Sequence, residues 1–115
     1  MKNITIKQIQ EWERSFVKRK GIKQNKDDAI KIALFKLIEE VGEVAKAVNE
    51  NKWSEVPAEV SDVIVFACKV ANIAEDFYGK EELTNVLKRK IDYCETRTYD
   101  KKNKKFNKPK NKEFK

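Results

Sequence analysis

Two short acidic stretches hold the residue types best suited to chemistry in this chain. The first reads EEVGE at residues 39–43, and the second reads EVSD at residues 59–62, after a spacer of fifteen residues, 44–58. Carboxylates are hard oxygen ligands, which suit Mg²⁺ or Mn²⁺ and not zinc or copper. We therefore expect a divalent-cation site if the fold brings the two stretches together.

Both stretches place carboxylates at helical spacing. Glu40 and Glu43 are three residues apart, as are Glu59 and Asp62, so each pair shares a helix face beside apolar positions, while Glu39 lies farther round. Crowded, partly desolvated carboxylates repel one another, which favours a cation between them. The alternative is that these residues are exposed helical glutamates paired with lysines.

Other kinds of reactive site are scarce. The chain has no His, which excludes a His general base, a Ser-His or Cys-His pair and a His-ligated zinc site. Cys68 and Cys94 form no Cys-x-x-Cys motif and are expected to be buried thiols. No signal-peptide pattern and no membrane-length apolar run is present, so we expect a cytoplasmic protein.

Apolar periodicity predicts one all-α domain, because Gly and Pro are too few for an all-β chain of this length. The expected helices cover about residues 6–20, 27–49, 54–78 and 80–98. Gly21 and Gly79 are expected to end the first and third helices, and Ser54 to cap the third. The second helix is apolar on more than one side, with Ile32 and Phe35 outside its main stripe, so we expect a homo-oligomer.

The third and fourth helices should each separate polar from apolar sides. The expected solvent side of the third helix consists of Ser61, Lys69, Asn72, Glu75 and Asp76. In the fourth helix, Lys90 and Arg97 fall on the apolar stripe and should point inward. They would then contact the phosphates of an anionic, metal-bound substrate, unless their long side chains reach out to solvent.

Positive charge is concentrated at the end of the chain. Residues 1–99 hold 18 basic and 17 acidic side chains, whereas residues 100–115 hold 8 and 2, which accounts for most of the net charge of +7. We therefore expect a domain at 1–99 and a basic, mobile tail at 100–115. Such a tail can contact nucleic acid through phosphate attraction, although a solvated tail without a partner is the ordinary interpretation.

The paired motifs, their spacing and the helix pattern resemble the EExxE…ExxD signature of the MazG-like, all-α nucleoside triphosphate pyrophosphohydrolases, over about residues 6–99. This resemblance implies a compact helical protomer in an oligomer and Mg²⁺-dependent cleavage of a nucleoside triphosphate to a monophosphate and pyrophosphate. Within the same architecture, phosphoribosyl-ATP is an alternative substrate. From a different class, the chain could be a non-enzymatic helical module that binds nucleic acid through its tail.

The resemblance also implies roles by position. The metal ligands would be Glu40, Glu43, Glu59 and Asp62. Glu39 would be a further ligand or would orient the attacking water. Lys90 and Arg97 match the family's fourth-helix pattern Lys-x-x-x-Asn-x-x-Arg, but Cys94 replaces its Asn. For base stacking, Trp12 is the better candidate and Trp53 the weaker one, although a helical Trp is more often a core residue.

Overall fold

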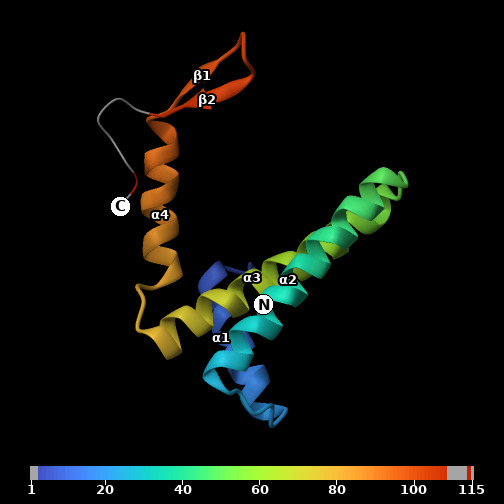
Figure 1. The fold of residues 1–115 in the computed structure, drawn as a ribbon, viewed down its shortest axis with the longest axis vertical. Helices are drawn as coiled ribbons and strands as arrows, with labels where there is room; N and C mark the ends of the chain where they lie inside the picture. The colour runs from blue at the N-terminus through green and yellow to red at the C-terminus, as the bar shows by residue number, and fades with distance from the viewer. Residues whose placement is uncertain (1–2, 109–113, 115) are drawn as a thin grey trace. The chain divides into compact units, whose positions relative to one another are not determined.

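A computed structural model describes residues 3–108 and 114 of the chain. Within them the all-α prediction is confirmed, since four α-helices and one 3₁₀ turn are accompanied by a single short strand pair (Figure 1). The elements are α1 (Ile6–Arg19), α2 (Lys26–Asn49), η1 (Trp53–Glu55), α3 (Val56–Tyr78), α4 (Leu83–Glu95), β1 (Thr98–Asp100) and β2 (Lys105–Asn107). None of the described helices is both long and apolar enough to cross a bilayer.

The chain forms two compact units, residues 1–80 and 81–115. In the first unit, α2 and α3 lie side by side, and α1 packs on α3 (Figure 1). The second unit contains α4 and the hairpin β1–β2. The expected domain boundary at residue 99 stays a prediction.

Local signals explain where the helices of the first unit begin and end. Thr5 and Gln8 form a reciprocal capping box at the start of α1. The side chain of Asn25 accepts a hydrogen bond from the backbone N–H of Asp27 at the start of α2. Gly79 ends α3 with a φ of +62°, a left-handed conformation that glycine adopts without strain.

Three expected helix boundaries are wrong. Ser54 does not cap α3, because it lies inside η1, and α3 begins at Val56 without a side-chain cap. The fourth helix begins at Leu83, not at Lys80, and it ends at Glu95. The chain then turns at Thr96 into the first strand, so the predicted last turn of that helix does not form.

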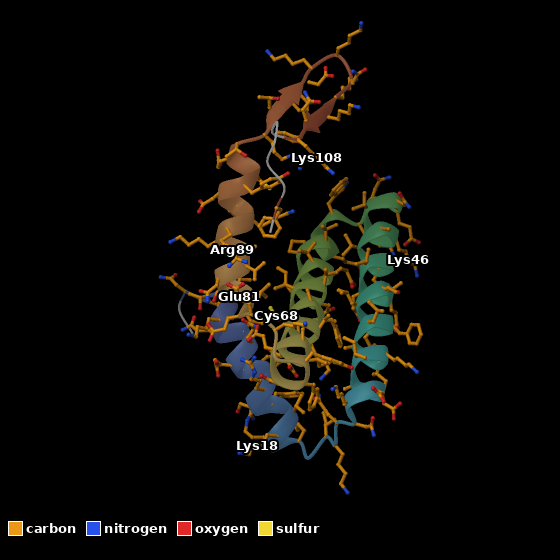
Figure 2. All side chains as sticks on the ribbon, turned by 60° about the vertical axis from the view of Figure 1, so that its left-hand side comes forward. Lys18, Lys46, Cys68, Glu81, Arg89 and Lys108 are labelled. Carbon is orange, nitrogen blue, oxygen red and sulfur yellow. The ribbon has the colours of Figure 1, made fainter. Side chains whose placement is uncertain are left out.

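Small residues allow α2 and α3 to approach closely. Ala29 and Ala33 lie one helical turn apart on α2 and are buried against Ile73 of α3, with Ile30 and Val70 packed around them. Cys68, which Figure 2 labels on α3, is buried as expected. Cys94 is exposed, contrary to the expectation of two buried thiols.

The contact between α1 and α3 is polar, which corrects the expected solvent side of α3. Asn72 is only 2% exposed; its side-chain amide donates to the Glu13 carboxylate at 2.9 Å and accepts from Gln10 at 2.9 Å. Lys69 donates to Glu13 at 3.2 Å, and Arg14 pairs with Glu75 at 2.9 Å. These side chains therefore form a hydrogen-bonded seam between two helices. Asp76 is exposed but also pairs with Arg14, at 2.9 Å, whereas Ser61 is exposed as expected.

Candidate functional site

Three carboxylates from two helices converge in the first unit. Glu40 extends from α2, and Glu59 and Asp62 extend from one face of α3. One oxygen from each lies within 4.8 Å of the others. Glu40 and Glu59 are half-buried, and Asp62 is exposed. The packing of α2 against α3 therefore brings one carboxylate of the first acidic stretch to two of the second.

The close approach of these three carboxylates is electrostatically unfavourable for Glu40. Desolvation raises the pKa of Glu40 above its ordinary value, and the negative charges of Asp62, Glu39 and Glu59 raise it further, with only partial opposition from Lys36. Within residues 3–108 and 114, no Lys or Arg forms an ion pair with the three carboxylates. Three oxygen donors that form no ion pair with a described Lys or Arg suit a hard divalent ion.

The other two acidic residues of EEVGE lie outside this group. Glu39 is exposed and pairs with Lys36 at 3.3 Å. Glu43 is exposed and is not among the three clustered carboxylates. Its α-helical position is about 60° round the helix from Glu40 and about 4.5 Å farther along the axis. The roles of Glu39 and Glu43 stay predictions.

Lys90 and Arg97 lie in the second unit. Lys90 is exposed, and its ammonium group lies 4.4 Å from the ring centroid of Phe114. The Arg97 guanidinium donates to the backbone carbonyls of Phe106 at 3.3 Å and Asn107 at 3.4 Å. Arg97 is thus bound to the hairpin that follows it, and the phosphate role of both residues stays a prediction.

An apolar groove of about 360 Å³ lies beside α1 and α3. Its lining residues are Ile4, Ile9, Trp12, Ser61, Ile64 and Val65. Trp12 is 38% exposed, with its ring 5.1 Å from that of Phe16. Trp53 is not among the lining residues and is exposed on η1. Trp12 is therefore available for stacking in a groove whose other wall is the helix that holds Asp62.

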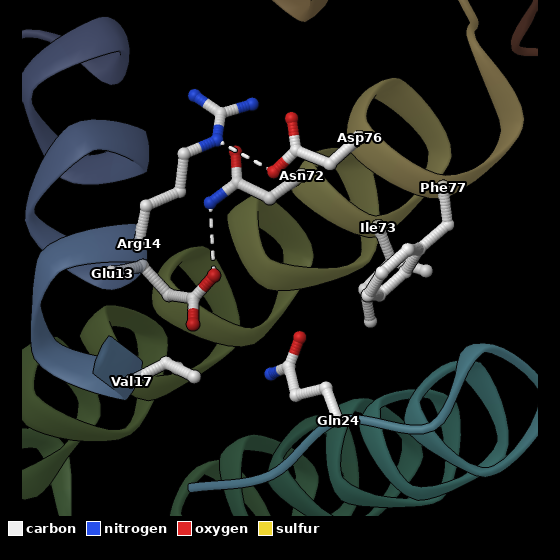
Figure 3. Close-up of a pocket in the computed structure, with 8 residues that line it drawn as sticks. All are labelled: Glu13, Arg14, Val17, Gln24, Asn72, Ile73, Asp76 and Phe77. Atoms are coloured by element: carbon white, nitrogen blue, oxygen red, sulfur yellow. Dashed lines mark hydrogen bonds and ion pairs between the residues drawn. The ribbon is translucent and has the colours of Figure 1, made fainter. Parts of the chain in front are cut away.

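A second pocket, of about 190 Å³, lies next to the polar seam (Figure 3). It is lined by Glu13, Arg14, Val17, Gln24, Asn72, Ile73, Asp76 and Phe77. Figure 3 shows the hydrogen bonds from Asn72 to Glu13 and from Arg14 to Asp76. The spacing of Asn72 and Asp76, four residues apart, could have identified this face, but only together with knowledge that α1 covers it.

Comparison with known proteins gives one match. The model of the MazG nucleotide pyrophosphohydrolase domain matches residues 22–100, which include both acidic stretches and all of α2, α3 and α4. No curated protein and no solved structure matches the chain.

Proposed function

Since the chain belongs to the MazG nucleotide pyrophosphohydrolase family, we propose that it cleaves a nucleoside triphosphate to the monophosphate and pyrophosphate with the help of Mg²⁺. The observation that carries this proposal is the convergence of Glu40, Glu59 and Asp62 within 4.8 Å. The paired motifs alone could have been ordinary surface glutamates. Their convergence, with the charge of Lys36 opposing their repulsion only in part, favours a metal-binding role.

The residues present fit a hard divalent ion. Glu40, Glu59 and Asp62 would hold it, with Glu43 as a fourth ligand after a small change of side-chain conformation, since Glu43 is exposed. A bound Mg²⁺ would neutralise phosphate charge and make a bound water easier to deprotonate, and Mn²⁺ would be a substitute. The family typically uses a divalent metal.

The chain's own side chains would supply the remaining functions. Glu39, next to the carboxylate group and exposed to solvent, would orient the attacking water and accept its proton. Lys90 and Arg97 would bind the phosphate oxygens of the substrate, Arg97 in bidentate fashion. Trp12 would stack on the base in the apolar groove.

The active form would be a homo-oligomer. Much of the apolar surface of α2 is exposed in the single chain, with Phe35 68% exposed and Ile32 60% exposed. Apolar side chains in such numbers on one helix are typical of a surface covered by another protein. The cytoplasmic location stays a prediction.

Pyrophosphate release tests the proposed reaction. The full chain is assayed with ribo- and deoxyribonucleoside triphosphates and with phosphoribosyl-ATP, each with and without Mg²⁺. We expect metal-dependent release from at least one nucleoside triphosphate. Glu59→Gln should lower turnover by about a hundredfold or more, since losing a metal ligand removes several kcal/mol of charge stabilisation.

Glu55→Gln is the matched control. Glu55 is exposed, lies one turn before Glu59 and is not among the clustered carboxylates, so the variant should keep its turnover. Equal losses in the two variants would contradict the metal-site assignment. Release of pyrophosphate from phosphoribosyl-ATP alone would replace the proposed substrate, and no release from any compound would overturn the proposed reaction.

A further inference from the structure

The hairpin β1–β2 spans residues 98–107 and therefore begins just before the segment expected to be a mobile tail, residues 100–115. Thr98 pairs with Asn107, Tyr99 with Phe106, and Asp100 with Lys105 in an antiparallel register. The Asp100 carboxylate accepts hydrogen bonds from the backbone N–H groups of Lys102 at 3.0 Å and Asn103 at 3.1 Å. The four-residue turn 101–104 is therefore held by the side chain of Asp100, the last residue of β1. The rest of the expected mobile tail, residues 109–113 and 115, lies outside the described residues.

One face of the hairpin presents two aromatic rings to solvent. Tyr99 and Phe106 are directly opposite in the register, and their ring centroids are 5.1 Å apart. Tyr99 is 51% exposed and Phe106 is 56% exposed. The Arg97 guanidinium lies 5.6 Å from the Phe106 ring. Both rings therefore keep about half of their surface open to solvent in the single chain.

The same hairpin carries unpaired positive charge. Lysines occupy positions 101, 102, 104, 105 and 108, all of them exposed. Within the described residues, no carboxylate forms an ion pair with any of these five. The one acidic residue of the hairpin, Asp100, directs its oxygens at the turn, and these bonds lower its pKa. The hairpin is thus cationic, with its only carboxylate already engaged.

We propose that the β1–β2 hairpin is a binding site for single-stranded nucleic acid, separate from the proposed hydrolytic reaction. The combination of exposed rings and unpaired lysines is what such a strand recognises: bases stack on the rings, and phosphates contact the ammonium groups. A duplex offers the same phosphates, but its bases are stacked inside and unavailable. The aromatic pair therefore favours the single strand, and the lysines alone would not distinguish the two.

The charge contribution is tested by fluorescence anisotropy with a labelled single strand of DNA or RNA and the full chain. The variant Lys101→Gln, Lys102→Gln, Lys105→Gln should weaken binding and reduce the slope of log affinity against log salt by about 2, as expected for three lost phosphate contacts. The control variant Lys7→Gln, Lys23→Gln, Lys31→Gln removes the same charge from exposed positions of the first unit. It should bind like the parent, and equal weakening of both variants would overturn the proposal.

The stacking contribution is tested with Tyr99→Leu. Loss of one stacked base should weaken single-strand binding by roughly tenfold without changing the salt slope, and duplex binding should stay the same. Tyr78→Leu is the control, because Tyr78 is a partly exposed tyrosine of α3 in the first unit. Equal binding by Tyr99→Leu and the parent would show that the rings do not stack on bases and would overturn the proposal.

Photocrosslinking locates the contact independently of affinity. A 5-iodouracil-substituted strand irradiated with the full chain should join to the peptide that contains Tyr99 or Phe106. Crosslinks confined to the peptide that contains Trp12 would place the strand in the apolar groove and overturn the hairpin assignment. Pyrophosphate release is measured separately on the parent and on Tyr99→Leu. Its absence from both proteins would count against the proposed hydrolysis and not against strand binding, whereas its loss in the variant alone would contradict the separation of the two sites.

Discussion

Glu40 is the residue whose surroundings most clearly distinguish a metal site from an ordinary helical surface. Its pKa is raised by desolvation and by three neighbouring carboxylates, so its ionised form is less favourable in the folded chain than in the unfolded one. Removing the charge should therefore stabilise the metal-free protein. We expect Glu40→Gln to have a higher melting temperature than the parent at pH 7 in the presence of a chelator.

The sign of the pH dependence follows from the raised pKa. The destabilisation by ionised Glu40 is fully present above that raised pKa and disappears as the pH falls through it to below the ordinary value of 4.5. The advantage of Glu40→Gln should therefore vanish in acid. Added Mg²⁺ should raise the melting temperature of the parent and that of the variant much less. A parent indifferent to Mg²⁺, or a variant less stable at pH 7, would contradict the metal-site assignment.

Glu43→Gln is the informative comparison for Glu40→Gln. Glu43 belongs to the same motif but is exposed and outside the clustered carboxylates, so its removal should leave the metal-free melting temperature nearly unchanged. If Glu43 becomes a ligand when the ion binds, the stabilisation by Mg²⁺ should nevertheless be smaller in this variant. Thermal melts of both variants with and without Mg²⁺ measure the two effects separately.

At the scale of the elements, the positions of the helices in the chain are easier to predict from the sequence than the faces on which the helices pack. Periodicity and the glycines at 21 and 79 placed α1, α2 and α3 to within a few residues. The same pattern assigned Asn72 to solvent, because periodicity records polarity and not which helix covers a face. The hairpin was missed because its stability depends on the Asp100 turn bonds and the Tyr99–Phe106 pair, which composition does not reveal.

The candidate site also contains residues whose surroundings could be predicted from the sequence and residues whose surroundings could not. Glu59 and Asp62 could be predicted to act with Glu40, because three-residue spacing fixes a shared helix face and α2 lies next to α3 in the chain. The environment of Lys90 and Arg97 could not be predicted in this way. Periodicity predicts that both side chains face inward, whereas Lys90 is exposed and Arg97 donates to backbone carbonyls of the β1–β2 hairpin, most of which lies in the predicted mobile tail.

The polar seam between α1 and α3 gives a prediction at this scale. Asn72→Ala would leave the buried side chains of Gln10 and Glu13 each without one hydrogen-bond partner. We expect a loss of about 1–3 kcal/mol in the free energy of unfolding, measured by urea denaturation with an unchanged slope. Asn85→Ala, at an exposed position of α4, should change it by less than about 0.5 kcal/mol. Similar values for the two variants would show that the seam contributes nothing specific.

For the whole molecule, the distribution of apolar surface is unusual for a chain of this composition. Within the described residues no large side chain is fully buried, and the core cluster consists of Ala29, Ala33 and Ile73 with two partly buried neighbours. Meanwhile α2 exposes a series of large apolar residues, namely Ile32, Leu34, Phe35, Ile38, Val41 and Val48. The intramolecular core therefore uses only one side of α2, and the remaining apolar surface is available to a second copy.

Association of copies of the chain gives the last prediction. Static light scattering at micromolar concentration should report at least twice the chain mass of 13.5 kDa. Phe35→Glu places a charge on the most exposed apolar position of α2, where burial in an interface would desolvate it, so this variant should dissociate toward the chain mass. Lys31→Glu changes more charge at an exposed polar position of the same helix and should keep the parent mass. A parent that remains a folded monomer would contradict association through α2. A Phe35→Glu variant that keeps the oligomer mass would contradict it as well, because the exposed side of α2 would then not be what holds the copies together.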